Sequence, residues 1–279
     1  MRLFLLSVVA FVFFSLYNLT SFTKPTYTQV LSATEEVEST FPTLSDPQVT
    51  PELSAKSVYA VDMDSHMVLF SKNPDLKVLP ASTTKIVTAL VALDYYYPEM
   101  VLTVGNMQVE GQTMGLVEGE EITFEDLLYG LLIFSANDAA EVMAQNYPGG
   151  RDLFVSAMNI KAGKLGLANT HFTNPTGFDG ESQYSTARDL VAVSSYALKD
   201  DFFKRVVATT EWEAKSIDGN IVHQLVNINE LIGEVDGVLG VKTGWTQNAQ
   251  ENLVTYVFRD GRKIMIALLG SQDRFGETR

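Results

Sequence analysis

Residues 79–93 read Leu79-Pro80-Ala81-Ser82-Thr83-Thr84-Lys85-Ile86-Val87-Thr88-Ala89-Leu90-Val91-Ala92-Leu93. A proline suits the first turn of a helix, and the apolar run after it is typical of a buried helix. Ser82 and Lys85 are three residues apart, so a helix places them on one face, within reach of each other. Burial lowers the pKa of a lysine, which makes a neutral Lys85 amine a suitable base for a Ser82 nucleophile.

Two more motifs follow in order, Ser135-Ala136-Asn137 and Lys242-Thr243-Gly244, and each of these exact triplets occurs once in the chain. A second S-x-x-K, from Ser21 to Lys24, directly follows a hydrophobic run and is interpreted as linker. Each motif alone is weak. Together, in this order, the three motifs predict an enzyme that transfers acyl groups through a serine.

The surroundings of the second motif predict two helices joined by a turn. Thr123 and Asp126 form a capping box before the apolar run 127–134, and another helix is expected from Asp138. The turn would push Ser135 and Asn137 into a cleft. The alternative is that both residues only cap the second helix.

The third motif is expected on a strand near the C-terminus. Lys242 and Thr243 there offer a cation and a hydroxyl, which suit a terminal carboxylate, and a strand edge suits an extended peptide. The alternative for Lys242 is an ordinary solvated lysine. Trp245 is interpreted either as cleft wall or as core.

Composition excludes several other kinds of site. The chain has 279 residues, a formal net charge of -14 and no cysteine, which argues against nucleic-acid binding, disulfides and thiol catalysis. His66, His171 and His223 are far apart in sequence, so we expect turn or surface histidines, no metal and no cofactor.

The N-terminus predicts membrane targeting. Arg2 precedes an apolar run from Leu3 to Leu19, which as a helix would span about 26 Å, slightly less than the hydrocarbon core of a bilayer. Residues 1–19 are therefore interpreted as a signal peptide or a membrane anchor, with an anchor slightly favoured. Residues 20–53 are rich in Ser, Thr, Pro and Glu and predict a flexible extracytoplasmic linker, followed by a catalytic domain at 54–279.

Strand patterns stand at both ends of that domain, and helical patterns lie between them. Residues 58–70 predict a hairpin, and 238–243, 253–258 and 263–269 predict three strands, the last two joined at Asp260-Gly261-Arg262. Helices are expected at 151–168 and from a Thr186 cap to Leu198. This order suggests one antiparallel sheet closed by both ends, with a helical insert.

These stretches resemble the serine-type D-alanyl-D-alanine carboxypeptidases, the low-molecular-weight penicillin-binding proteins of peptidase family S11. The resemblance covers roughly residues 57–279 and rests on 79–85, 127–132 running into 135–140, 158–159, 169–178 and 242–246. It implies an α/β (α+β) fold of the β-lactamase/transpeptidase type, with a five-stranded, mostly antiparallel sheet packed between helices. It also implies action outside the cytoplasm, with the peptidoglycan stem peptide as substrate and β-lactams as covalent inhibitors.

The resemblance also implies a role for each motif residue. Ser82 would be acylated, Lys85 would activate it, and Ser135 would pass the proton to the leaving amine. Asn137 would hold the substrate amide, while Lys242 and Thr243 would bind the terminal carboxylate. Gly244 would leave room for the substrate backbone, and the N–H groups of Ser82 and Trp245 would form the oxyanion hole.

Other functions remain open at this stage. An endopeptidase shares all three motifs, whereas a serine β-lactamase would need a deacylating group that the surroundings of Glu181 do not match. A non-catalytic β-lactam-sensing or wall-binding module is the alternative from another class. Relatives usually continue beyond the position of Arg279 into a helix, so we also expect apolar sheet surface to be exposed.

Overall fold

The computed structural model describes residue 42 and residues 51–279. The predicted targeting segment at 1–19 lies outside the described residues, as does most of the predicted linker at 20–53. Within the described part of the chain, no helix combines the length and the apolar character needed to cross a bilayer. The boundary of the catalytic domain at residue 54 stays a prediction.

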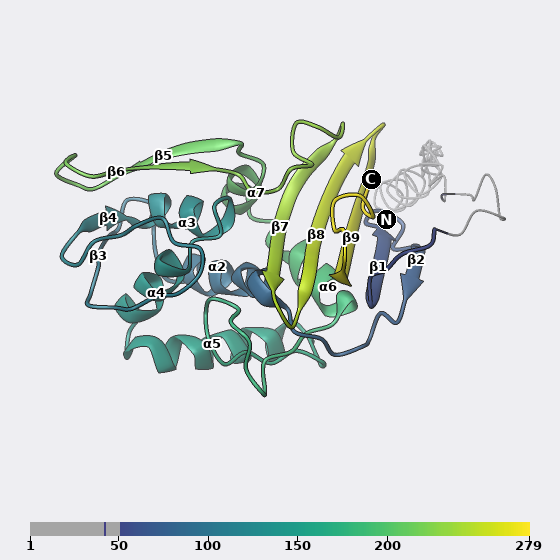
Figure 1. The fold of residues 1–279 in the computed structure, drawn as a ribbon, viewed down its shortest axis with the longest axis horizontal. Helices are drawn as coiled ribbons and strands as arrows, with labels where there is room; N and C mark the ends of the chain where they lie inside the picture. Colours follow the sequence, from purple (N-terminus) through teal and green to yellow (C-terminus); the bar gives the residue numbers. More distant parts are fainter. Residues whose placement is uncertain (1–41, 43–50) are drawn as a thin grey trace, which may run out of the picture. The chain divides into compact units, whose positions relative to one another are not determined.

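A five-stranded antiparallel sheet lies on one side of the fold, in the order β2-β1-β9-β8-β7 (Figure 1). Its strands are β1 (Ser57–Asp62), β2 (Val68–Lys72), β7 (Val238–Thr246), β8 (Gln250–Arg259) and β9 (Arg262–Ser271). β1 pairs with β9, with Val58 opposite Leu268, so the first and last strands are neighbours. This confirms the predicted sheet that both ends of the domain close, and with it the α+β fold class.

Tight turns fix the register of the sheet. Arg259 lies opposite Arg262, so only Asp260 and Gly261 connect β8 to β9, and both have positive φ, at 50° and 74°. Two consecutive residues with positive φ make the turn whose twist suits a two-residue hairpin. The predicted turn at Asp260-Gly261-Arg262 is thus confirmed, and the predicted hairpin at 58–70 is the β1–β2 pair.

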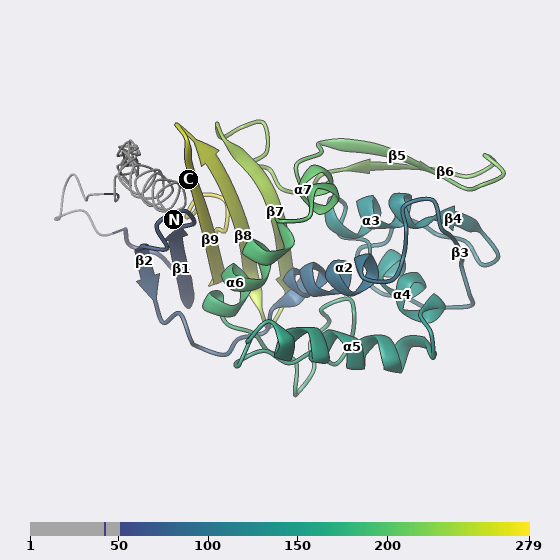
Figure 2. The same cartoon turned by 180° about the vertical axis from the view of Figure 1, so that it is seen from behind.

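The helices lie beside the sheet and against one of its faces. They are α2 (Lys85–Leu93), α3 (Phe124–Leu132), α4 (Asn137–Asn146), α5 (Gly150–Lys164), α6 (Ala187–Ala197) and α7 (Asp201–Val207). Figure 2 shows α6 crossing the sheet, where it packs on β1 and β9. The predicted caps are confirmed, because Thr123 and Thr186 each accept a backbone N–H three residues on, both at 3.1 Å.

Two small hairpins were not predicted. β3 (Val101–Thr103) pairs with β4 (Glu121–Thr123), and β5 (Glu211–Lys215) pairs with β6 (Val222–Val226). β5 packs on α3 through Trp212, whose ring stacks on Tyr129 at 3.8 Å. Charged residues fill the outer face of β5, which weakens the apolar signal that would identify a strand.

The central helix of the insert is α2, which contacts α3, α4, α5 and α6. Its residues from Lys85 to Ala92 are all buried. A short 3-10 helix, η1 (Ala81–Thr84), leads into it and packs against β7 of the sheet. Ser82 therefore stands where the sheet and the helices meet.

Candidate active site

Ser82 and Lys85 are brought together by the 3-10 geometry of η1. A 3-10 helix has about three residues per turn, so residues i and i+3 lie directly in line. The Lys85 Nζ lies 2.9 Å from the Ser82 Oγ. The sequence predicted this contact on an α-helix; the structure shows a tighter turn, which aligns the two side chains more directly.

Lys85 is fully buried, and all three atoms around its amine can accept hydrogen bonds. Besides Ser82, it donates to the Asn137 Oδ1 at 2.6 Å and to the Thr176 carbonyl oxygen at 2.7 Å. Desolvation lowers the pKa of Lys85 to about 7, against an opposing pull from Asp138 and Glu141. When neutral, Lys85 keeps two donors for the amide and carbonyl oxygens, and its lone pair faces the one neighbour that can give a proton, the Ser82 hydroxyl.

The turn between α3 and α4 carries Ser135 and Asn137. Ser135 has φ of 63°, a left-handed conformation that side-chain-bearing residues adopt at a cost. Asn137 opens α4, and its Nδ2 donates to the Glu110 carbonyl oxygen at 2.8 Å, so its Oδ1 is left facing Lys85. The alternative in which both residues only cap α4 does not describe this arrangement, because neither side chain caps that helix.

β7 carries the third motif along the cleft. Thr243 and Trp245 line it, and Trp245 is 62% exposed, so its side chain is cleft wall rather than core. A β-carbon at Gly244 would lie 3.0 Å from the Ser82 amide nitrogen, so a larger residue would crowd the backbone of η1. Gly244 thus lets η1 approach β7, and the expected room for the substrate backbone at Gly244 stays a prediction.

Lys242 lies behind this wall. It is 1% exposed, and its Nζ donates to the Thr243 carbonyl oxygen at 3.0 Å. Burial lowers the pKa of Lys242 well below its usual value, and the nearby charges of Lys85 and Arg274 lower it further. Lys242 is therefore not the solvated strand lysine of the alternative interpretation.

The eight predicted residues surround one cleft of about 650 Å³. Six of them line it directly, namely Ser82, Ser135, Asn137, Thr243, Gly244 and Trp245. Lys85 and Lys242 are buried and do not line it. Sequence reasoning missed Arg274, which also lines the cleft and whose buried Nε has no hydrogen-bond partner among the described residues. Burial lowers the pKa of Arg274.

A second missed element is the loop after α5. Thr176, Gly177, Phe178 and Asp179 line the cleft opposite β7. The Asn174 Oδ1 binds this loop together by accepting from the Gly177 and Phe178 amides at 2.8 and 3.1 Å. The run Asn174-Pro175-Thr176-Gly177 signals a turn, but nothing in its spacing connects that turn to Lys85.

The histidines follow the sequence expectation only in part. His66 is an exposed turn residue, and the His171 Nδ1 lies 2.7 Å from the Ser182 carbonyl oxygen in a loop. His223 is 6% exposed, so the expectation of a surface or turn position is wrong for this residue. It lies on the inward face of β6, where it pairs with Glu120.

Three features define the penicillin-recognising class of serine acyl-transfer enzymes. They are a serine at a helix start, a buried lysine beside it and a cation-lined cleft at a strand edge. The chain belongs to the D-alanyl-D-alanine carboxypeptidase family, peptidase family S11, whose family model matches residues 44–273.

Known proteins agree with this assignment. The chain is 37% identical over 223 residues to the D-alanyl-D-alanine carboxypeptidase DacB2 of Mycobacterium tuberculosis, covering 78% of this chain and 76% of the relative. It is 33% identical over 252 residues to a D-alanyl-D-alanine endopeptidase of Pseudomonas aeruginosa, covering 88% and 80%. The crystal structure of the Streptomyces K15 DD-transpeptidase aligns with a TM-score of 0.77 at 30% identity, covering 82% of this chain and 96% of that one.

Proposed function

We propose that this protein is a serine D-Ala-D-Ala carboxypeptidase that removes the terminal D-Ala from peptidoglycan stem peptides through an acyl-enzyme on Ser82. The observation that carries the proposal is the fully buried Lys85 amine, 2.9 Å from the Oγ of Ser82, which lines the cleft.

The first half of the reaction forms the acyl-enzyme. Neutral Lys85 takes the Ser82 proton while Oγ attacks the carbonyl carbon between the two D-Ala residues. The backbone N–H groups of Ser82 and Trp245 receive the oxyanion. As the C–N bond breaks, the Ser135 hydroxyl passes the proton from Lys85 to the leaving amine, and free D-Ala departs.

The second half reverses these roles with water as nucleophile. A water molecule gives its proton to the neutral Lys85 and attacks the acyl carbon. As the ester bond breaks, Lys85 returns that proton to the Ser82 Oγ, and the shortened peptide departs. Asn137 faces the cleft beside Lys85 and would hold the substrate amide during both halves.

The charges of the cleft favour a substrate with a free carboxylate. Lys85, Lys242 and Arg274 lie close enough that the charges of Lys85 and Arg274 lower the pKa of Lys242. A bound carboxylate would offset this mutual repulsion. Arg274 and Thr243 are the groups that line the cleft, so we assign carboxylate binding to them, with Lys242 supplying charge from behind.

Two assays test the proposal. Fluorescent penicillin followed by intact-mass spectrometry should show one adduct on the wild type and none on Ser82→Ala; an adduct on that variant would exclude Ser82 as the nucleophile. Release of D-Ala from a synthetic pentapeptide, compared with cleavage of crosslinked dimers, separates carboxypeptidase from endopeptidase. An adduct with neither activity would indicate a β-lactam-sensing module instead.

The substrate also fixes the proposed location, because peptidoglycan lies outside the cytoplasm. We propose that residues 1–19 carry the domain across the membrane and remain as an anchor, with residues 20–53 as a tether. Fractionation of cells that express a C-terminally tagged chain tests this. Full-length protein in the membrane pellet supports an anchor, whereas a shortened soluble form would mean a cleaved signal.

A further inference from the structure

The loop from Gly105 to Gly119 forms one wall of the cleft without any helix or strand of its own. Gly111 and Gln112 line the cleft directly. The Gln112 carbonyl oxygen accepts from the Asn137 backbone N–H at 2.7 Å, and the Glu110 carbonyl oxygen accepts from the Asn137 Nδ2 at 2.8 Å. The loop therefore sets the orientation of the amide whose oxygen accepts from Lys85.

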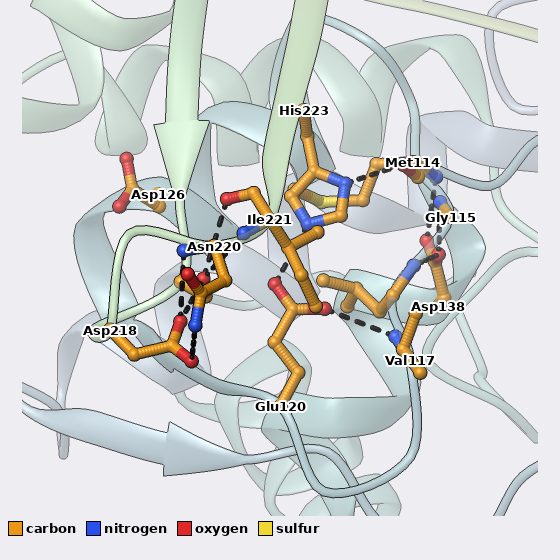
Figure 3. A network of polar contacts seen from close by, with 12 residues as sticks. Met114, Gly115, Val117, Glu120, Asp126, Asp138, Asp218, Asn220, Ile221 and His223 are labelled. Carbon is orange, nitrogen blue, oxygen red and sulfur yellow. Dashed lines mark hydrogen bonds and ion pairs between the residues drawn. The ribbon is translucent and has the colours of Figure 1, made fainter.

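One side of this loop is held from α4. The Asp138 carboxylate accepts hydrogen bonds from three consecutive backbone amides, those of Met114, Gly115 and Leu116, at 3.0, 2.9 and 3.1 Å (Figure 3). Asp138 follows Asn137 in sequence, so the same helix start holds the loop and faces the cleft.

The other side is held by His223 from β6. Its Nδ1 lies 2.9 Å from the Met114 carbonyl oxygen, and its Nε2 lies 2.8 Å from the Glu120 Oε1. The Glu120 Oε2 in turn accepts from the Val117 amide at 3.0 Å, and Figure 3 shows these contacts closing a ring that includes residues 114–117. The His223 and Glu120 side chains are 5% and 0% exposed.

Hydrogen-bond chemistry fixes how this pair is arranged. A carbonyl oxygen only accepts, so the His223 Nδ1 must donate to Met114. The contact between Nε2 and the Glu120 Oε1 then needs one proton, which either atom can carry. Without that proton two acceptors would face each other in a buried site, which is costly. The pair thus works as a unit that joins β6 to both ends of residues 114–117.

We propose that His223 and Glu120 are positioning residues for acylation: they fix the 105–119 loop, and through it Asn137 and the Lys85 amine. The proposal rests on the proposed function, because it assigns Lys85 the role of base. Neither residue lines the cleft or touches Ser82, so the effect must pass through the loop.

The chemistry of the pair allows a graded set of variants. Glu120→Gln keeps every contact without an ionisable proton, since its amide oxygen accepts from Val117 and its NH₂ donates to a neutral Nε2. His223→Asn keeps the donor to Met114, and His223→Gln keeps the donor to Glu120. Glu120→Ala and His223→Ala remove the connection. Leu268→Ala, in a buried cluster with Ala55 and Val58 on the sheet, serves as a control for lost stability alone.

The test measures saturable acylation by a chromogenic β-lactam together with thermal melting. Glu120→Ala and His223→Ala should lower the limiting acylation rate by about ten- to a hundredfold, because small misplacements of catalytic groups have effects of this size. The half-saturating concentration should change far less. Glu120→Gln should stay close to wild type, and the two single-donor variants should fall between. If the alanine variants do not fold, the acylation rates of Glu120→Gln, His223→Asn and His223→Gln still test the proposal.

Three outcomes would overturn the proposal. The first is a wild-type acylation rate in the alanine or single-donor variants. The second is a Glu120→Gln variant that is as slow as Glu120→Ala or as the single-donor variants. The third is an equal loss of rate in Leu268→Ala at a matched melting temperature. Failure of the proposed function is distinguishable, because the wild type itself would then form no adduct on Ser82.

Discussion

Gly177 lies directly against the backbone that carries the nucleophile: a β-carbon at position 177 would overlap the Ala81 carbonyl group and lie 3.0 Å from the Ser82 amide nitrogen. Gly177 also has φ of 93°, which favours glycine. The loop opposite β7 can therefore approach η1 only because residue 177 has no side chain.

Gly177→Ala should accordingly impair acylation, because η1 or the loop must move and both hold atoms around Lys85. We expect the rate of penicillin labelling to fall by at least about tenfold, since small displacements of reacting groups have large effects. Gly219→Ala is a matched control, because Gly219 also has positive φ but open space around it. Equal labelling rates in the two variants would contradict the proposed crowding.

Acylation should depend on pH through Lys85. Burial lowers the pKa of Lys85 to about 7, so the amine is protonated and inactive as a base below that pH and neutral above it. The second-order rate of acylation should rise about tenfold per pH unit up to pH 7 and then level off. The measurement uses a β-lactam whose carboxylate stays ionised from pH 5 to pH 9. A flat profile over this range would exclude Lys85 as the base.

Arg274 should distinguish substrates by their C-terminus. Arg274→Ala should lower kcat/KM for a peptide with a free carboxylate by roughly ten- to a hundredfold, because a hydrogen bond to a charged group is worth about 1.5–3 kcal/mol. The matched peptide amide should lose much less, and Thr243→Val should show the same preference. Arg188→Ala, which removes an exposed arginine paired with Asp75, is the control. Equal losses on both peptides would indicate a general structural role.

Substitutions of Ser135 should affect folding stability and the acylation rate in different ways. Its left-handed backbone costs alanine about as much as serine, but glycine adopts it freely. Ser135→Gly and Ser135→Ala should both slow acylation, because neither keeps the hydroxyl. Ser135→Gly should be the more stable of the two by about 1 kcal/mol, measured by urea unfolding. A Ser135→Gly variant less stable than Ser135→Ala would show that the φ angle is not under strain.

Local patterns were enough to predict the elements that carry the three motifs. The Thr123 and Thr186 caps, the Asp260-Gly261 turn and the spacing of Ser82 and Lys85 each depend on residues only a few positions apart. Such signals survive in a sequence because they are decided by local hydrogen bonds and backbone geometry.

The missed features depend on contacts between distant parts of the chain. Arg274 reaches the cleft only because the β8–β9 hairpin returns the chain toward β7. The His223 and Glu120 side chains meet across 103 residues of sequence, and no periodicity marks either of them as a partner. The burial of Lys242 likewise follows from η1 packing over β7, which no pattern within that strand encodes.

The pairing of β1 with β9 has a consequence for how the protein folds during synthesis. Ser82 is made early and Thr243 late, and within the sheet β7 pairs only with β8, which pairs with β9, whose other edge pairs with β1. Contacts this distant in sequence form slowly, after the local helices. A nascent chain would therefore carry its nucleophile without the surrounding cleft until the last strand is made. Penicillin labelling of chains stalled at successive lengths should begin abruptly, once β9 has emerged.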